Sequence, residues 1–268
     1  MLVDLPLVTR VEQSAGRLTA AEVGALAARS PASGAASRPL DGGVLAAMGP
    51  GRYVNRGVGV GLGGTPTAVL LDELESFFGQ RGLPPMLEVS PWAPTELVAE
   101  LAARGYTVQW FRDVFAHPLG DLPTPSVLRV HEVHDDPAAD WAADWAAILA
   151  ADTEAGSAAR EIALEFCDAV RHVANSVHLV ALVGEQPVAT GSLSIVDGVG
   201  WLGGAATLAA QRGQGAQHAL LVERLHRARS AGCTLAAATA LPHGVSARNL
   251  QRVGFRLLYS QTVMARLA

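Results

Sequence analysis

A loop with two glycines one residue apart, set between a short apolar run and a regular helix, constrains this chain more than any other feature. It runs "QRGQGAQ" from Gln211 to Gln217 and is followed by "HALLVERLHRARSAG". Glycines let successive backbone N–H groups turn toward one point, and the following helix adds its free N–H groups and the positive end of its dipole. The loop is therefore predicted to bind a pyrophosphate.

The surroundings of the loop argue against two other phosphate-binding motifs. A P-loop needs Gly-Lys-Ser/Thr, but the sequence contains no lysine, so all 20 basic residues are arginine. The same absence excludes Schiff-base chemistry and the kinase lysine. A dinucleotide fold needs GxGxxG after the first parallel strand of a unit, whereas the strand before this loop is predicted to close an antiparallel meander.

The composition predicts a globular protein of two domains, because 268 residues, 50% of them hydrophobic, are enough for two cores. A net charge of -5 gives no basic stripe, so we expect no nucleic-acid partner. No apolar run reaches the roughly 18 residues of a membrane span, and Asp4, Arg10 and Glu12 interrupt the hydrophobic N-terminus. We therefore expect a cytoplasmic protein without membrane association. Cys167 and Cys233 form no CxxC or zinc pattern, which predicts buried thiols and no metal site.

Three prolines and a glycine in "HPLGDLPTPS", residues 117–126, mark the predicted domain boundary. Strand-like stretches flank this segment on both sides. The predicted domains are residues 1–123 and 124–268.

The second half is predicted to place helices around an antiparallel meander. A strand at 127–133 precedes helical material from Pro137 to Ala151, in which Trp141, Trp145 and Ile148 recur at helical spacing and are expected in the core. The elements predicted after it are a helix at 160–174, the strands "VHLVALVGE", "QPVATGSLSIVDG" and "GWLGGAATLAA", the helix after the glycine loop, the strand "TLAAATAL", a helix through "SARNLQRV" ending at Gly254, and a strand pair from Phe255 to Leu267.

The first half is less regular at its start. Helical segments to about Ala28 and a loop at 30–39 precede strand-like "RYVNRGVGVGLG", whose alternation of Gly and Val is interpreted as a strand and not as a second nucleotide loop. Helix "AVLLDELESFFGQRG", strand "MLEVSP", helix "TELVAELAARG" and strand "YTVQWFRDVFA" follow. This order matches the end of the second half, and "ELAARGYTV" aligns with "NLQRVGFRL", which predicts an internal repeat of one α/β unit.

The order of elements around the loop resembles a known family. A strand, "QRGQGAQ", a helix, a buried strand and a short helix ending "NLQRVGF" are similar to the acyl-CoA core of the GNAT superfamily of N-acetyltransferases, over about residues 127–268. The resemblance implies an α/β (α+β) fold with a mixed, mainly antiparallel central sheet flanked by helices, in two tandem GNAT-like domains. The C-terminal domain would bind acetyl-CoA. The N-terminal domain would be a degenerate copy that has lost its cofactor site and supplies a wall of the substrate cleft.

The resemblance also implies which residues hold coenzyme A. Backbone N–H groups of the loop would bind the pyrophosphate, the end of the preceding strand would pair with the pantetheine arm, and the short helix would flank that arm. The implied cofactor-binding residues are Ala206, Thr207, Leu208, Gln211, Arg212, Gly213, Gln214, Gly215, Ala216, Gln217, Ser246 and Asn249. Gln217 stands where the family prefers Gly or Ala.

Catalysis is where the sequence departs most from the family. Leu250, five residues before Phe255, stands where many members place the tyrosine that protonates the departing CoA thiolate. A thiolate whose conjugate acid has a pKa of about 8.5 leaves without much help, so a transferase lacking this tyrosine is chemically feasible. His243 is the candidate acid or base, and Tyr259 is a weaker candidate that is expected in the core. No base is identifiable on the strands.

Three functions stay open at this point. The first is an acetyl-CoA-dependent N-acetyltransferase acting on the amine of a small-molecule or peptide acceptor. The second is a catalytically weak or inactive protein that binds acyl-CoA as a ligand or sensor, and the third is an interaction protein with two degenerate halves. An exposed final strand could pair two copies, so a homodimer is a further expectation.

Overall fold

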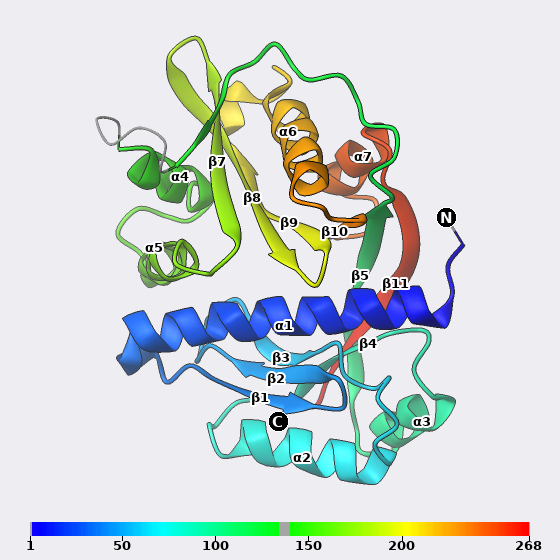
Figure 1. Cartoon of the computed structure of the whole chain (residues 1–268). Helices are drawn as coiled ribbons and strands as arrows, with labels where there is room; N and C mark the ends of the chain where they lie inside the picture. Colours follow the sequence, from blue (N-terminus) through cyan, green and yellow to red (C-terminus); the bar gives the residue numbers. More distant parts are fainter. Residues whose placement is uncertain (1, 134–139, 268) are drawn as a thin grey trace. The chain divides into compact units, whose positions relative to one another are not determined.

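The computed structural model describes residues 2–133 and 140–267, which fold into two compact units (Figure 1). Unit 1 holds the described residues up to Val114 together with those from Leu258 onward, and unit 2 holds Phe115–Leu257. Each unit has its own hydrophobic core.

Unit 1 is a sheet with one long helix on one face and two shorter helices on the other (Figure 1). Its elements are α1 (Leu5–Arg29), η1 (Pro31–Ser33), β1 (Ala36–Leu40), β2 (Gly43–Ala47), β3 (Asn55–Val58), α2 (Thr67–Gly79), β4 (Met86–Val89), α3 (Thr95–Ala103), most of β5 (Thr107–His117) and most of β11 (Arg256–Ala265). The strand order is β1-β2-β3-β4-β11-β5. β3 and β4 run parallel, and the pairs β1–β2, β2–β3 and β4–β11 run antiparallel.

Local signals in the sequence explain the start of α1. The Oδ1 atom of Asp4 accepts a hydrogen bond from the N–H of Leu7 at 3.0 Å, and a proline lies in the first turn. Apolar residues of α1, among them Val8 and Leu26, are fully buried, and the helix packs on β1, β2 and β3. Leu74 and Phe78 of α2 belong to the core cluster on the other face of the sheet.

Two predictions for the first half are wrong. Part of the segment 30–39 forms β1, which pairs with β2 through a two-residue turn at Asp41 and Gly42, both with left-handed backbone (φ 48° and 83°). The strand-like "RYVNRGVGVGLG" forms a strand only over β3, because Gly59 and Gly61 have positive φ (68° and 104°) and turn the chain away.

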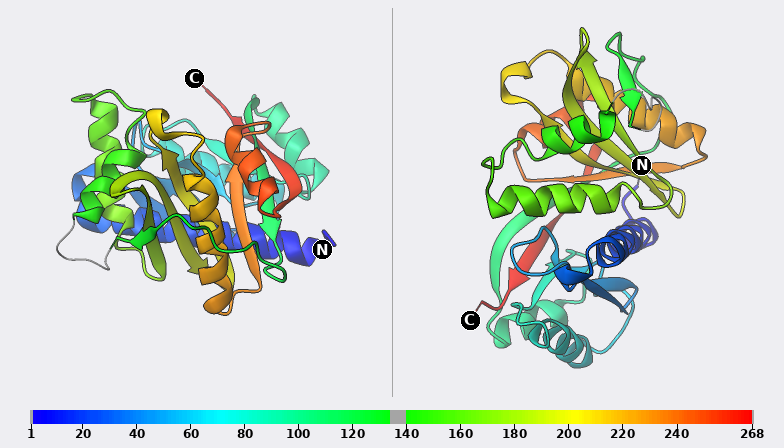
Figure 2. Two further views of the ribbon diagram at one scale, coloured as in Figure 1. Left: turned by 90° about the horizontal axis from the view of Figure 1, so that it is seen from above. Right: turned by 90° about the vertical axis from the view of Figure 1, so that its left-hand side faces the viewer.

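Unit 2 is a sheet with α4 and α5 on one face and α6 and α7 on the other (Figures 1 and 2). Its elements are β6 (Val130–Glu132), α4 (Trp141–Leu149), α5 (Ala158–Val170), β7 (Ser176–Val183), β8 (Gln186–Val196), β9 (Val199–Thr207), η2 (Ala209–Gln211), α6 (Ala216–Ser230), β10 (Leu235–Ala240) and α7 (Val245–Arg252), with the ends of β5 and β11. The strand order is β5-β10-β9-β8-β7-β6.

The predicted meander is confirmed, because β6, β7, β8 and β9 pair antiparallel in sequence order, and β10 then joins β9 in parallel. The prediction of a mixed, mainly antiparallel sheet flanked by helices is also correct. Trp145 and Ile148 of α4 are buried, as expected for core residues, whereas Trp141 is only half-buried. The predicted helix start at Pro137 lies outside the described residues.

The internal repeat is present in the structure as two matching series of elements. α2, β4, α3 and β5 in unit 1 correspond in order to α6, β10, α7 and β11. The helices α3 and α7 end in the same way. Gly105 and Gly254 have positive φ (81° and 96°), and the residues after them donate backbone N–H groups to the carbonyls of Leu101 and Leu250 at 2.9 and 3.1 Å.

The end of the chain is arranged differently from the expected strand pair. Residues 256–265 form one strand, β11, and not a strand pair. This strand lies between β4 and β5, so the final strand is no exposed edge, and the expected route to a homodimer through it is wrong. The compact units also divide after Val114 and give unit 1 the last strand, whereas the predicted boundary lies at residue 124. That division depends on the pairing of β11 with β4, two strands that lie far apart in the sequence.

The remaining expectations concern side chains and classes of site. Cys167 and Cys233 are both buried, and burial raises the pKa of the Cys167 thiol to about 12. Of the helices in the described part of the chain, none combines the length and apolar character that a membrane span requires. Within residues 2–133 and 140–267, His, Cys, Asp and Glu side chains form no cluster able to hold a metal ion.

Candidate functional site

The glycine loop of unit 2 joins the end of β9 to the start of α6. Gly213 and Gly215 both have left-handed backbone, with φ of 85° and 84°. A Cβ on Gly213 would meet nothing within 4 Å, and one on Gly215 would meet only Leu128 at 3.8 Å. Backbone conformation rather than crowding therefore requires these glycines, and there is open space beside them.

The start of α6 has no side-chain cap. Gly215 is the N-cap residue and no side chain accepts from the first turn, whereas Asp4, Asp140 and Ser157 cap α1, α4 and α5. The first N–H groups of a helix have no partner within the helix, and the dipole places partial positive charge there. The start of α6 can therefore accept an anion.

The strands β9 and β10 pair only at their beginnings. Leu235, Ala236 and Ala237 lie opposite 199–201, but β9 continues to Thr207 and β10 to Ala240 without further pairing between them. The second part of β9 is partly exposed, unlike its first four residues. The strands thus diverge toward the glycine loop and leave one edge of β9 open to an extended ligand.

Gln217 turns its side chain away from the loop. Its Nε2 atom donates to the carbonyls of Thr190 at 3.1 Å and Ala206 at 2.6 Å. The side chain therefore ties the start of α6 to β8 and β9 and leaves the space beside Gly213 and Gly215 clear. The bulk of glutamine at this position does not obstruct the loop.

At the mouth of the loop, Arg212 and Gln214 are exposed and Gln211 is half-buried. Arg212 is 62% exposed, and its guanidinium lies 3.8 Å from the exposed carboxylate of Asp152. Gln214 donates to Gln211 at 2.5 Å, which in turn lies 3.4 Å from Gln186. A surface ion pair of this length contributes little, so Arg212 can exchange it for a phosphate.

The sequence also assigned residues after β10 to the site. Because β9 and β10 are parallel, their carboxyl ends lie at the same edge of the sheet, which brings His243, Ser246 and Asn249 to the edge that carries the glycine loop. His243 is exposed, has a positive φ of 58°, and accepts from Arg248 through its carbonyl at 2.8 Å. Ser246 is exposed and Asn249 is half-buried.

Leu250 and Tyr259 both serve packing. Leu250 is buried in the core cluster beneath α6 and α7, and so offers no acid at the position of the family's tyrosine. Tyr259 belongs to unit 1, where its buried hydroxyl donates to Glu12 at 2.9 Å. Burial and the neighbouring carboxylate raise the pKa of Tyr259, which makes it a poor acid.

Sequence reasoning missed a distortion of β9 and the residues around it. The register of β8 and β9 shifts between the pairs Thr190–Ala206 and Ser192–Gly203, so β9 carries one extra residue there. Gly204 is one of the two residues of β9 that lie between these pairs, and its backbone is left-handed, with a φ of 57°. A glycine pair inside a predicted strand, "GG" in "WLGGAAT", was the available signal.

Two buried groups lie beside the bulge on opposite faces of the sheet. On the α4 face, His178 Nδ1 is 2.9 Å from Ser192 Oγ, and a Cβ on Gly204 would lie 2.5 Å from the same oxygen. Such a pair can pass a proton between its members. On the α6 face, Arg224 donates to the carbonyl of Gly203 at 3.1 Å.

Unit 1 has a glycine loop at the corresponding place, between β3 and α2, and that loop already holds an anion. The carboxylate of Asp41 accepts backbone N–H bonds from Gly61 and Gly63 at 3.0 Å each and from Thr65 at 2.7 Å. These three donors form a nest of the kind that binds phosphate. The sequence did not predict this nest, because its ligand comes from the β1–β2 turn.

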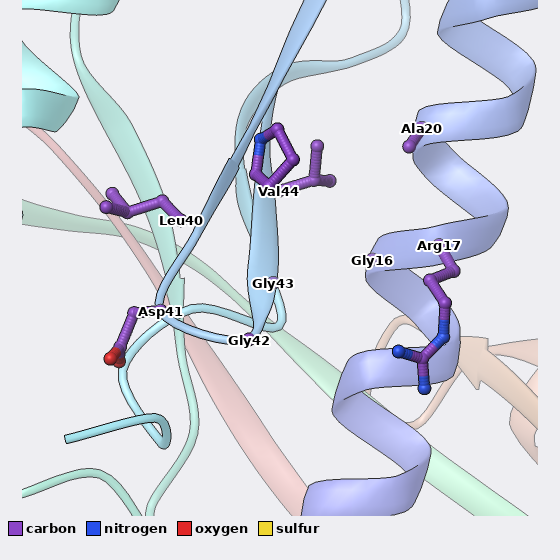
Figure 3. A pocket seen from close by; sticks show the side chains of 9 residues that line it. Gly16, Arg17, Ala20, Leu40, Asp41, Gly42, Gly43 and Val44 are labelled. Carbon is purple, nitrogen blue, oxygen red and sulfur yellow. The ribbon is translucent and has the colours of Figure 1, made fainter. Parts of the chain in front are cut away.

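A pocket of about 320 Å³ lies beside Asp41 in unit 1, between α1 and the β1–β2 hairpin (Figure 3). Gly16, Gly42 and Gly43 form much of its wall, and Arg17 and Asp41 are its charged residues. Figure 3 shows the Asp41 carboxylate pointing away from α1. That carboxylate is bound by the glycine loop between β3 and α2.

Comparison with known proteins agrees with the geometry of unit 2. Residues 137–255 match the model of the acetyltransferase (GNAT) family. Unit 2 contains a GNAT domain. No curated protein is similar enough in sequence to count as a relative.

Solved structures of GNAT proteins share the fold over most of the chain. A GCN5-related N-acetyltransferase from Kribbella flavida is 18% identical, with 95% of this chain and 96% of that chain covered at a TM-score of 0.65. A tandem GNAT protein from the clavulanic acid biosynthesis pathway is 14% identical, with 83% and 77% covered at a TM-score of 0.56. A GCN5-related N-acetyltransferase from Sphaerobacter thermophilus is 18% identical, with 79% and 71% covered at a TM-score of 0.56. At these identities the likeness concerns the fold alone.

Proposed function

We propose that unit 2 binds acetyl-CoA and transfers the acetyl group to the amine of a small-molecule or peptide acceptor. The observation that carries this proposal is the uncapped start of α6 at a glycine loop, on the edge where β10 diverges from β9. The loop would bind the pyrophosphate through N–H groups of Gly213 to Gln217, with Gln211 and Arg212 beside it. The open edge of β9 at Ala206–Leu208 would pair with the pantetheine arm.

The remaining groups of the site take supporting roles in this proposal. Ser246 and Asn249 on α7 would flank the pantetheine arm. His243 would act as acid or base, since its side chain is exposed and histidine is the side chain that most often transfers protons in catalysis. Positioning of the two substrates supplies much of the rate in acyl transfer, so the absence of the tyrosine at Leu250 slows the reaction without abolishing it.

The cofactor site is tested by calorimetric titration of the full chain with acetyl-CoA. We expect wild-type binding in the micromolar range. In Gly215→Glu the affinity for acetyl-CoA should fall roughly tenfold or more, because a carboxylate would occupy the pyrophosphate position. Gly82→Glu is the matched control, since Gly82 is an exposed glycine of unit 1 that also has a positive φ (62°), with nothing within 4 Å of its Cβ position. Absence of binding by the wild-type protein would overturn the proposal.

The role of His243 is tested once an amine panel has given a turnover signal from released CoA thiol. We expect His243→Gln to lower kcat by roughly 100-fold while the affinity for acetyl-CoA stays the same, because proton transfer and not binding is removed. An unchanged kcat would assign His243 to the surface and leave the acid and base to other groups, of which the Ser192–His178 pair is the first to test.

A second function is favoured by one observation, the burial of Leu250 in place of an acid. In that alternative the protein binds acyl-CoA as a ligand or sensor and turns over slowly or not at all. Tight acetyl-CoA binding without CoA release across the whole amine panel would support it. Release of CoA with any amine above the rate of hydrolysis would exclude it.

A further inference from the structure

Arg224 is a charged residue on the buried face of α6. It is 1% exposed and lies between the buried residues Leu220, Leu221 and Leu225. A guanidinium rarely enters a core unless it is paired, because removing the charge from water is costly. The burial lowers the pKa of Arg224 to about 9.

Within the described part of the chain, Arg224 bonds backbone carbonyls and no carboxylate. Its Nε atom donates to Leu220 at 2.9 Å, and its Nη1 atom donates to Ser192 at 3.2 Å and Gly203 at 3.1 Å. Its Nη2 atom is buried and has no hydrogen-bond partner among the described residues. Stability alone would be served as well by a leucine at this helix position, so the arginine points to another role.

The carbonyls that Arg224 reaches flank the β-bulge of β9. Three side chains donate to carbonyls of this segment: Arg224 to Gly203, Thr190 Oγ1 to Gly204 at 3.0 Å, and Gln217 to Ala206. Strand β8 has a glycine where the guanidinium lies, since a Cβ on Gly191 would be 2.7 Å from its Cζ atom. The contact between Arg224 and the bulge is therefore built into both elements.

The orientation of the Gly203 carbonyl determines the direction of the next N–H group. In a trans peptide the C=O and N–H bonds point in opposite directions, so a carbonyl held toward Arg224 turns the Gly204 N–H away from α6. A cationic donor on the carbonyl also polarises the peptide and strengthens its N–H as a donor. Gly204 belongs to the part of β9 that β10 leaves unpaired.

This inference rests on the proposed function, which lays the pantetheine arm along Ala206–Leu208. Continuing back along β9, the acyl end of the ligand would reach Gly203 and Gly204. We infer that Arg224 is a positioning residue for the thioester, because it holds the Gly203 carbonyl so that the Gly204 N–H faces the acyl carbonyl oxygen. The bond would strengthen as charge develops on that oxygen during transfer.

The test compares the affinities of acetyl-CoA and of CoA, which differ only in the acyl group. We expect the wild-type chain to bind acetyl-CoA roughly fivefold more tightly than CoA, the gain of about one hydrogen bond. In Arg224→Leu the affinity for CoA should stay within twofold and the preference for acetyl-CoA should disappear. Arg229→Leu on the same helix, which loses only a bond to the Gly120 carbonyl, should keep the preference.

A second variant keeps the arginine and moves it. Gly191→Ala places a Cβ against the guanidinium and should also remove the preference for acetyl-CoA while the affinity for CoA stays the same. The inference can therefore be tested even if Arg224→Leu does not fold. Arg224→Lys, which keeps the charge but not the forked donors, should restore part of the preference.

The outcomes separate this inference from the proposed function. A wild-type protein that binds neither ligand would overturn the proposed function. A wild type that binds both equally, variants that keep the preference for acetyl-CoA, or variants that lose both affinities in parallel would overturn the role of Arg224 and leave the cofactor site intact. With a turnover assay, the variants should show a reduced kcat, and the KM for acetyl-CoA should rise by no more than the roughly fivefold loss of affinity.

Discussion

Glu12 is a carboxylate buried in the core of unit 1, 3% exposed, on α1. Tyr259 donates to its Oε1 atom at 2.9 Å, and Gln261 donates to both of its oxygens at 2.8 and 3.0 Å. Burial raises the pKa of Glu12, and the hydrogen bonds from Tyr259 and Gln261 and the charge of Arg112 only partly oppose it. The folded unit therefore binds a proton at Glu12 more tightly than the unfolded chain does.

This linkage predicts a pH dependence of stability. A carboxyl group whose pKa is higher in the folded state contributes its full stability below its ordinary pKa of 4.5 and loses it as the pH rises through the folded value. We expect the free energy of unfolding by urea to fall less steeply with pH, above about pH 4.5, in Glu12→Gln than in the wild type. Glu96→Gln, at an exposed carboxylate in the first turn of α3, is the control. Equal slopes for wild type and Glu12→Gln would show that Glu12 is not the linked group.

Buried charged residues such as Glu12 show what could not be predicted from the sequence. The loop from Gln211 to Gln217 and the helix after it were predictable as structure, because glycine spacing and helix periodicity are local. Arg224 and Glu12 lie four residues after the buried Leu220 and Val8, so the helical period places both on buried faces, but nothing near them in sequence shows which groups they bond there. Their partners, Gly203 and Tyr259, come from other elements.

The glycine loops before α2 and α6 show how similar elements take different roles. In the loop of unit 1, three backbone N–H groups converge on the carboxylate of Asp41. The loop of unit 2 has no acidic residue from Gln211 to Gln217 and meets no side-chain cap. The carboxylate of Asp41 thus stands where a phosphate oxygen would bind, which supports a structural role for the glycine series "RGVGVGLGG".

Removing that carboxylate should destabilise unit 1. We expect Asp41→Ala to lower the free energy of unfolding by roughly 2–4 kcal/mol, since backbone donors lose their acceptor and alanine is strained at the positive φ of this turn. Asp41→Asn should cost roughly half as much, because asparagine tolerates the turn and keeps one oxygen acceptor. Chemical denaturation of the full chain measures both. A loss below about 0.5 kcal/mol for Asp41→Ala would show that water replaces the carboxylate without cost.

At the scale of elements the sequence predicted regular pieces well and irregular ones poorly. The helices and strands of the repeat, from α2 to β5 and from α6 to β10, have strong periodicity and glycine ends. The β1–β2 hairpin was missed although Asp41-Gly42 is a strong turn signal, because Pro39 and small residues make β1 resemble a loop. β3 was overextended because Gly and Val alternate past the point where positive φ ends the strand.

The whole molecule contains two copies of the α/β unit, and we expect only the copy in unit 2 to bind the cofactor. Sequence order alone revealed the repeat, through "ELAARGYTV" and "NLQRVGFRL". It did not reveal that the last strand joins unit 1, because pairing of residues 262–265 with 86–89 leaves no local trace. The same long-range contact explains why the compact units do not follow the proline-rich segment.

The two loops together predict the stoichiometry of cofactor binding. With Asp41 in one nest and no side chain in the other, we expect titration of the full chain to give one acetyl-CoA per chain, and Gly215→Glu to remove all of it. Asp41→Asn should leave both the stoichiometry and the affinity unchanged, because its loop belongs to unit 1. Two sites per chain in the wild type, or binding that survives in Gly215→Glu and disappears when Gly63→Glu is introduced instead, would mean that unit 1 holds a cofactor and that Asp41 is displaced by its phosphates.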